Sequence, residues 1–298
     1  MNLKRIYKSP LRYPGGKQKD IPFLSQFLFP CKEFREPFLG GANILIYALE
    51  NSLAESYWGN DLNKSVFDFW QEVKLDVNQL ADLAWLLRDE YKGKRQKCRE
   101  WQDFRKNFIV KLNKLPDEQL YRAAKFFILN RSTSGGSTES GGMTPLAYCE
   151  RFTPSSVKTL RNLNNFFNNV NFTNLDYEEV VKKPGEKVLI FLDPPYLSSK
   201  SSGLYGKSGC LHKTFDHERL SEVLKNCNHD WLMTIDDCQE IRNLYHWAEQ
   251  LEWKKAYGMT NSGGQKSRQG AELLVANFTL KNSNLGKEVL VASKQKTI

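Results

Sequence analysis

Four consecutive residues, Asp193-Pro194-Pro195-Tyr196, could hold a planar group that carries an exocyclic amine. Pro194 and Pro195 have no backbone N–H to occupy nearby acceptors, so the Asp193 carboxylate and the Pro194 carbonyl stay available to both amine hydrogens. The ring of the bound group could stack on Tyr196. Drawing both hydrogens out of the ring plane would localise the nitrogen lone pair and make a weak amine nucleophilic. An ordinary turn after a strand is the alternative interpretation.

The element expected to position these residues is the apolar run 188–192, Val-Leu-Ile-Phe-Leu. Such a run predicts a buried parallel strand, and the prolines predict a rigid turn at its end. Its place directly before Asp193 favours a functional turn over an ordinary one.

A strand, a glycine turn and a helix are predicted over 34–49, the unit that opens a doubly wound sheet. Glycine at positions such as Gly40 would let a ligand approach the backbone closely. The next predicted strand, 55–60, leads to Asp61, a spacing that suits a carboxylate accepting hydrogen bonds from ribose hydroxyls. Asp61 could instead cap the following helix.

The N-terminal segment 11–17, Leu-Arg-Tyr13-Pro-Gly-Gly-Lys17, predicts a tight turn with a cation and an aromatic ring nearby. It lacks the glycine spacing and the Ser or Thr of a nucleotide-triphosphate loop.

Composition limits the class of protein. The chain has 298 residues, 40% hydrophobic and 26% charged, with a net charge of +9. No apolar stretch is long enough to span a membrane and no secretory signal begins the chain, which predicts a cytoplasmic protein. Scattered cysteines and histidines predict reduced thiols and no metal site.

Residues 64–130 have helical apolar stripes, and those between 88 and 114 combine ten Lys or Arg with four Asp or Glu. A basic face over Trp101, Phe104 and Phe108 is typical of a phosphate-binding surface. We therefore expect a helical insertion within an α/β domain.

Three segments could contact DNA or cover a pocket. Residues 132–142 are Gly, Ser and Thr with one Glu, so they could form a flexible linker or a loop that orders against phosphates. Residues 198–210 could form a lid. The predicted DNA contacts come from these loops, their flanks and the polar loop before the last strand: Arg131, Ser132, Arg151, Lys266 and Arg268.

Four signatures follow one another in a fixed order, and together they resemble the Dam-like (D12 class) DNA adenine-N6 methyltransferases over about residues 8–280. They are Leu-Arg-Tyr-Pro-Gly-Gly-Lys, Glu-Pro-Phe-Leu-Gly-Gly-Ala-Asn, Asn-Asp-Leu-Asn and Asp-Pro-Pro-Tyr. The resemblance implies an α/β fold: a Rossmann-like, doubly wound methyltransferase sheet with a mainly helical target-recognition insertion. It places the S-adenosylmethionine-binding catalytic domain at 1–63 and 171–280, the insertion at 64–170 and a polar tail at 281–298.

The resemblance also implies residue roles. Asp193, Pro194, Pro195 and Tyr196 would hold a flipped adenine, and Asp193 would also lie near the cofactor. The remaining cofactor contacts would be Tyr13, Lys17, Phe38, Gly40, Asp61 and Asp176. GATC-reading members place Gly-Tyr-Asn just after the Asn-Arg that ends the third helix. Here Ser-Thr-Ser-Gly-Gly follows Asn130-Arg131, which predicts a target other than GATC.

The predicted function is site-specific methylation of adenine N6 in duplex DNA by a monomer, in a restriction-modification, phage or bacterial DNA-modification setting. Cytosine-N4 methylation is one alternative, because cytosine also presents an exocyclic amine. A non-catalytic DNA-binding module on a methyltransferase fold is the other.

Overall fold

The computed structural model describes residues 7–13, 15–133, 142–197, 215–256 and 269–280. Its strands are β1 (Cys31–Glu36), β2 (Ala54–Asn60), β3 (Val170–Thr173), β4 (Val188–Leu192), β5 (Asp230–Asp236), β6 (Glu249–Ala256) and β7 (Gln269–Ala276). Its longer helices are α2 (Asn43–Glu50), α3 (Lys64–Leu86), α4 (Arg99–Asn113), α5 (Gln119–Ser132), α6 (Pro145–Arg151), α7 (Pro154–Arg161) and α10 (His217–Lys225). Short helices are η1 (Lys17–Lys19), α1 (Ile21–Leu24), η2 (Ser25–Phe27), α8 (Tyr177–Lys182) and α11 (Gln239–Leu244).

The seven strands form one sheet in the order β3-β2-β1-β4-β5-β7-β6. Strands β1 to β5 are mutually parallel, whereas β7 runs antiparallel to both β5 and β6. From β1 the chain moves outward to β2 and β3, then returns to β4 on the other side of β1. The order of the strands therefore reverses between β1 and β4, which is where doubly wound sheets bind ligands.

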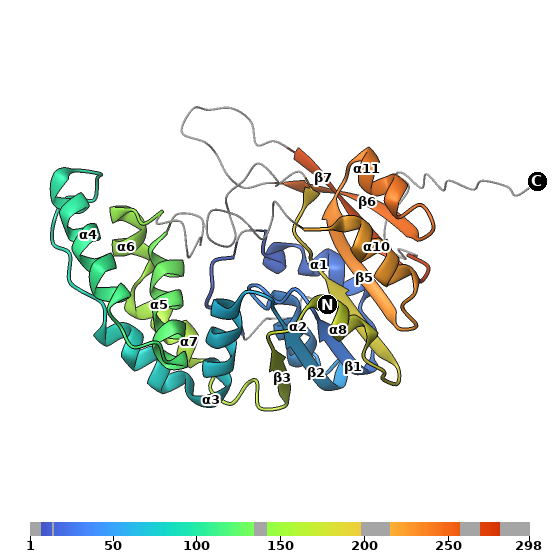
Figure 1. The fold of residues 1–298 in the computed structure, drawn as a ribbon, viewed down its shortest axis with the longest axis horizontal. Helices are drawn as coiled ribbons and strands as arrows, with labels where there is room; N and C mark the ends of the chain where they lie inside the picture. Colours follow the sequence, from blue (N-terminus) through green and yellow to red (C-terminus); the bar gives the residue numbers. More distant parts are fainter. Residues whose placement is uncertain (1–6, 14, 134–141, 198–214, 257–268, 281–298) are drawn as a thin grey trace, which may run out of the picture.

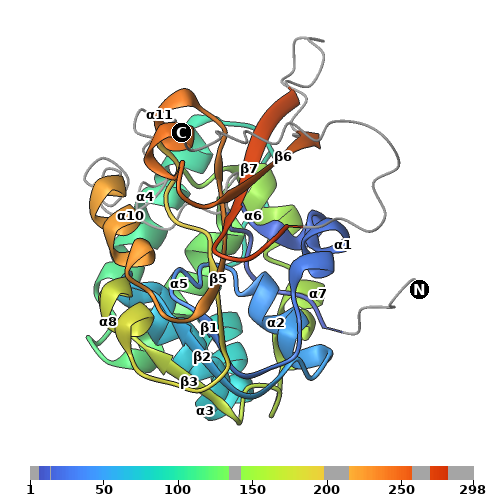
Figure 2. The same ribbon diagram turned by 90° about the vertical axis from the view of Figure 1, so that its right-hand side faces the viewer.

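Both faces of the sheet are covered, so the predicted doubly wound architecture is confirmed. Strand β4 is buried throughout, as its apolar run predicted, and its side chains alternate between two cores. Leu189 and Phe191 pack in the core that includes α2 and α3, while Val188, Ile190 and Leu192 pack in the core that includes α10 and α11. Figure 2 shows α8 and α10 on one side of the sheet and α1 and α2 on the other.

The predicted helical insertion is present and lies beside the sheet (Figure 1). Its longest helix, α3, is bent at Asp76, whose backbone is non-helical (φ −155°, ψ 87°). The half of α3 before this bend still packs on the sheet, because the buried Trp70 ring stacks on Phe172 of β3 with ring centres 6.4 Å apart. The Nε1 of Trp70 also donates to Gly40 O in the glycine turn at 2.9 Å. The helices of the insertion therefore begin at position 64, but the first part of α3 still packs against the sheet.

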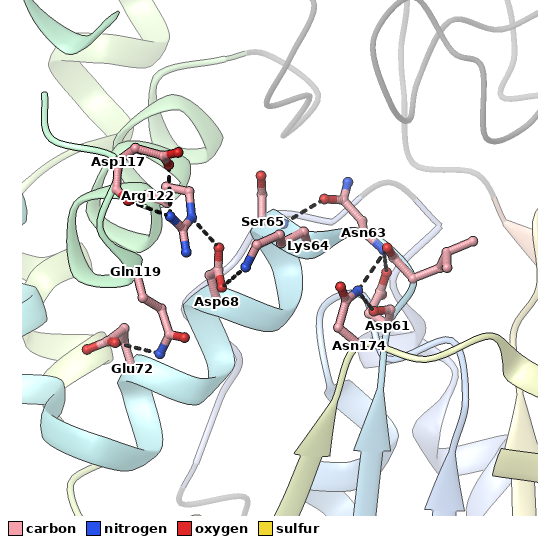
Figure 3. A network of polar contacts seen from close by, with 11 residues as sticks. Asp61, Asn63, Lys64, Ser65, Asp68, Glu72, Asp117, Gln119, Arg122 and Asn174 are labelled. Atoms are coloured by element: carbon pink, nitrogen blue, oxygen red, sulfur yellow. Dashed lines mark hydrogen bonds and ion pairs between the residues drawn. The ribbon is translucent and has the colours of Figure 1, made fainter. Parts of the chain in front are cut away.

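A charge network centred on the buried Asp68 joins α3 to α5 (Figure 3). The carboxylate of Asp68, which is fully buried, accepts hydrogen bonds from Arg122 Nε at 2.7 Å and Lys64 Nζ at 2.9 Å. Arg122 also pairs with Asp117 at 2.8 Å, and Gln119 donates to Glu72 at 2.7 Å. This network fixes α5 to the helix that follows Asp61.

One helix was not predicted from the sequence, and several predicted segments lie outside the described residues. The helix is α8, a short one between β3 and β4. Its six residues are too few for an apolar stripe to reveal it. The segments 198–210 and 281–298 fall outside the described residues, as does most of 132–142. Within the described part of the chain, no helix is long and apolar enough to cross a membrane.

Candidate active site

The predicted site residues gather at the carboxyl edge of the sheet, on either side of the reversal between β1 and β4. Glu36 is the last residue of β1, and Asp193 directly follows β4. The N-terminal segment reaches the same edge, since Lys17 Nζ lies 2.6 Å from Asp193 Oδ1. Residues far apart in the sequence thus meet because parallel strands present their carboxyl ends together.

Asp193 is held by a cation and a hydroxyl. Its Oδ1 accepts hydrogen bonds from Lys17 Nζ and, at 2.9 Å, from Thr234 Oγ1 on the neighbouring strand β5. Burial raises the pKa of Asp193, and the nearby Lys17 ammonium opposes that rise. Thr234 was not predicted as a site residue, because a threonine inside an apolar strand looks like an ordinary β-branched core residue.

Tyr196 lies against the same ammonium group. Lys17 Nζ is 5.1 Å from the centre of the Tyr196 ring, within the range of a cation–π contact, and also donates to Gly15 O at 3.0 Å. The Tyr196 hydroxyl donates to Glu272 Oε2 at 3.0 Å. The carboxylate and the aromatic ring of the turn are therefore joined through one buried lysine.

The glycine turn after β1 brings the backbone close to Tyr13. Gly40 has a φ of +45°, and a Cβ built there would lie 2.7 Å from Tyr13 Cε1. Only glycine fits this combination of left-handed backbone and close contact. The predicted partners Tyr13 and Gly40 are therefore packed together at this edge.

Asp61 links the second strand to the glycine turn. Its Oδ2 accepts from Gly40 N at 2.8 Å and its Oδ1 from Asn63 N at 2.9 Å. The cap of α3 is Asn63, which accepts from Ser65 N, so the alternative role of Asp61 as helix cap is wrong (Figure 3). Burial raises the pKa of Asp61 to about 6.

Glu36 is a site residue that the sequence reasoning did not single out. Its buried carboxylate accepts from Leu45 N of α2 at 2.7 Å, and so joins the end of β1 to the helix after the glycine turn. Burial raises the pKa of Glu36 well above its ordinary value, and the charges of Asp193 and Asp61 add to the rise. The signal in the sequence was an acid at the end of a strand, as at Asp193.

Phe38 and Asp176 lie toward the face of the sheet that α8 and α10 cover. Phe38 contacts Tyr177 and Phe215, with ring centres 5.4 Å and 5.7 Å away. Asp176 caps α8 by accepting from Glu178 N at 2.9 Å, and it forms an ion pair with Arg219 at 2.8 Å. Asp176 is thus already bound to a cation, unlike Asp61.

The predicted DNA contacts are only partly brought together. Arg131 Nε donates to Arg151 O at 2.9 Å, and Arg151 donates to Thr133 O at 3.2 Å. Burial and the charges of Arg12 and Arg151 lower the pKa of Arg131 to about 10. Two of the predicted arginines therefore form a positive cluster where the insertion meets the N-terminal segment.

Ser132 does not fit the DNA interface that we predicted. Its side chain is fully buried and its hydroxyl donates to Ile128 O at 2.6 Å, inside α5. A small polar residue at the end of a helix can satisfy its hydroxyl on the preceding turn, which is what happens here. Lys266 and Arg268 lie outside the described residues.

The basic face of the insertion has the predicted construction. Trp101 and Phe108 are buried, and Phe104 packs between them with ring centres 5.5 Å and 5.8 Å away. Most of the basic side chains around this aromatic core are exposed. The exposed ones are Lys92, Lys94, Arg95, Lys97, Arg99, Lys106, Lys111 and Lys114. No group of side chains that could hold a metal ion is found among the described residues.

Comparisons with known proteins identify the family of the chain. A family model described as D12 class N6 adenine-specific DNA methyltransferase matches residues 13–259, which include every site residue discussed at the carboxyl edge except Glu272. The chain is 27% identical over 250 residues to DNA N-6-adenine-methyltransferase of Escherichia phage P1, covering 80% of this chain and 31% of that protein. It is 23% identical over 283 residues to the type II methyltransferase M.MjaIII of Methanocaldococcus jannaschii, covering 90% and 98% of the two chains.

A third relative is DNA adenine methylase of Vibrio cholerae, 22% identical over 281 residues, with 90% of this chain and 95% of that protein covered. The chain thus spans about a third of the phage P1 protein and nearly the full length of the other two. Since the family model matches most of the sequence, the chain belongs to the D12 class of N6 adenine-specific DNA methyltransferases.

Proposed function

We propose that this chain transfers a methyl group to the N6 amine of an adenine that has been rotated out of duplex DNA. The proposal rests on the arrangement at the strand-order reversal. There Lys17 joins the Asp193 carboxylate to the Tyr196 ring, beside Gly40 and Asp61. Family membership supports adenine N6 as the acceptor over the N4 amine of cytosine.

The residues at this edge fit S-adenosylmethionine, the cofactor of this class of enzyme. Gly40 lets the turn approach the Tyr13 ring, which brings two of the predicted cofactor contacts together. Asp61 offers a half-buried carboxylate with no cation at ion-pair distance in the described part of the chain, which suits ribose hydroxyls. We assign cofactor binding to Tyr13, Lys17, Phe38, Gly40, Asp61 and Asp176. When bound, the cofactor supplies a methyl group on a sulfonium.

The Asp-Pro-Pro-Tyr turn orients the amine. Asp193 and the Pro194 carbonyl each accept a hydrogen bond from the amine. Pro195 keeps the turn rigid, and Tyr196 stacks on the base. Lys17 and Thr234 fix the Asp193 carboxylate before the base arrives. These residues act through positioning and electrostatics, and the amine needs no strong base because its proton becomes acidic once the methyl is attached.

The helical insertion would bind the duplex. Its exposed lysines and arginines can neutralise backbone phosphates, while Arg131 and Arg151 lie where the insertion meets the N-terminal segment. Lys266 and Arg268 remain proposed contacts from the loop before β7. Removing the target base from the stack lets one buried site act on it.

We further propose a cytoplasmic monomer that reads a target other than GATC, with the catalytic domain at 1–63 and 171–280 and the recognition domain at 64–170. One active site acting on one base at a time needs no second copy. The Ser-Thr-Ser-Gly-Gly sequence after Arg131 is what argues against GATC.

The test is transfer of labelled methyl from S-adenosylmethionine to unmethylated genomic DNA, followed by mass spectrometry of the nucleosides. N6-methyladenine is the expected product. N4-methylcytosine would keep the mechanism and contradict the base. No methylated nucleoside, with cofactor and DNA binding measured separately, would make the chain a binding module.

A further inference from the structure

Two buried acids lie behind the Asp-Pro-Pro-Tyr turn, on the strands that follow it. Asp236 is the last residue of β5 and is 8% exposed, and Glu272 on β7 is 1% exposed. They are register partners across the antiparallel β5–β7 pair. Because carboxylates are costly to bury side by side, their presence calls for a role.

Each acid holds one part of the turn. Glu272 Oε2 accepts from the Tyr196 hydroxyl at 3.0 Å, and Asp236 Oδ1 accepts from Leu197 N at 3.0 Å. The ring of Tyr196 and the peptide just after it are thus held by acids on two neighbouring strands, β7 and β5. Glu272 is also close enough to Asp193 for its charge to raise the pKa of that carboxyl.

The reversed direction of β7 explains how Glu272 reaches this place. In a strand parallel to β5, the residues at the carboxyl edge would come from the end of the strand. Since β7 is antiparallel, Glu272, which lies in its first half, is set beside Asp236 at the end of β5. The reversed strand therefore brings a buried acid to the site edge.

We propose that Glu272 is a positioning residue for the Tyr196 ring, holding the plane on which the target base stacks. The inference rests on the proposed function and names a residue outside the Asp-Pro-Pro-Tyr turn that this stacking requires. The hydrogen bond holds the tip of the side chain at 3.0 Å from Glu272 Oε2, so it limits the swing of the ring about the Cα–Cβ bond. A ring fixed before the base arrives loses less freedom when stacking begins.

The test is a double-mutant cycle in the full-length chain with Tyr196→Phe, Glu272→Leu and both together. Each single change removes the same hydrogen bond, so kcat is expected to fall about tenfold in either. The double variant should lose about as much as one single variant, with the KM for S-adenosylmethionine unchanged. Glu272→Gln keeps an acceptor at the same length and should retain more activity than Glu272→Leu.

A matched control is Glu252→Gln on the adjacent strand β6. Glu252 is 44% exposed and pairs with Arg242 at 3.2 Å, so its loss should leave kcat unchanged. Once the methylated site is mapped, a duplex with 2-aminopurine at the target position reports stacking directly. Glu272→Leu should change the fluorescence of the bound duplex, whereas Glu252→Gln should not.

Losses that multiply in the double variant to about a hundredfold would overturn the inference, as would wild-type kcat in Glu272→Leu. The same cycle in thermal unfolding needs no activity: non-additive Tm changes support the contact, and additive ones contradict it. A wild-type chain that methylates no adenine would refute the proposed function instead, and the unfolding cycle would still report on the Tyr196–Glu272 contact.

Discussion

The carboxyl edge of the sheet and the helical insertion differ in how their acids are paired. In the insertion, fully buried Asp68 is neutralised by Arg122 and Lys64. At the edge, Asp193 pairs with Lys17 alone, whereas Glu36 and Asp61 accept hydrogen bonds from backbone N–H groups and have no cation at ion-pair distance in the described residues. The pKa of both carboxyls is raised, chiefly by burial.

The difference separates a structural charge from a functional one. Both oxygens of Asp68 are bound by cations of the same chain, so this acid contributes to packing and has nothing left to offer a ligand. Asp193, by contrast, is bound through Oδ1 alone in the described residues. Acids left without cations are completed when a ligand brings hydroxyls, an amine or a positive charge. Changes at the edge should therefore alter chemistry or cofactor binding, and changes in the insertion should alter stability or DNA binding.

The largest expected effect is at the edge. Asp193→Ala removes the acceptor for the target amine and should lower kcat by about 10²–10³-fold, with DNA binding retained. Radiolabelled methyl transfer and a DNA-binding titration measure the two properties. Asp230→Ala, at the other end of the adjacent strand, is the control. Full turnover by Asp193→Ala would refute its assigned role.

Changes on the exposed basic face are expected to alter DNA binding and not turnover. Changing Lys94, Lys97 and Arg99 together to Gln should weaken DNA binding and leave kcat at saturating DNA unchanged. If all three contact phosphates, the slope of log affinity against log salt should shrink by about 2.7. Titrations at several salt concentrations measure it. An unchanged slope would remove these residues from the interface.

Gly40→Ala should raise the KM for S-adenosylmethionine about tenfold and lower stability by about 1–2 kcal/mol, because its φ of +45° is unfavourable with a Cβ. Gly142→Ala is the matched control, since a Cβ there meets nothing within 4 Å. Cofactor titration and thermal melts of both variants give the comparison. Equal behaviour of the two would show that the turn tolerates a side chain.

Asp68→Ala should destabilise the fold by about 1–3 kcal/mol, because it strips Arg122 and Lys64 of their shared acceptor. The kcat of the folded fraction should remain near that of the wild type. Denaturant unfolding and single-turnover rates measure the two quantities. A large loss of kcat without loss of stability would contradict the contrast between the regions.

A further effect concerns the pH dependence of stability. The pKa of Asp61 is about 6 in the folded chain and 3.8 ordinarily, so the folded state holds its proton more tightly. Asp61 therefore lowers stability above pH 6, and this loss disappears as the pH falls toward 4. Relative to Asp61→Asn, the wild type should gain up to about 2 kcal/mol between pH 7 and 4. A constant difference would refute the raised pKa.

The same protonation should weaken cofactor binding. Below about pH 6 the Asp61 carboxyl is increasingly neutral and loses acceptor capacity, so affinity for S-adenosylmethionine should fall there. Isothermal titration of wild type and Asp61→Asn from pH 5 to 8 checks it, with the variant as the pH-insensitive reference.

The sequence by itself determined the central strand and the glycine turn, and it predicted the residues of the candidate site. The apolar run before Asp193 specified a buried strand, and the glycines before α2 specified a turn, because burial and backbone freedom are local properties. The helical stripes likewise located the insertion, although α8 was too short to detect.

Only the tertiary structure decided which groups meet. Thr234 and Glu272 lie on strands that give no local sign of a site, and they reach Asp193 and Tyr196 through the order and direction of β5 and β7. The burial of Ser132 and the ion pair of Asp176 with Arg219 were decided in the same way. A side chain's partners depend on strand order, which segments distant in the sequence create together.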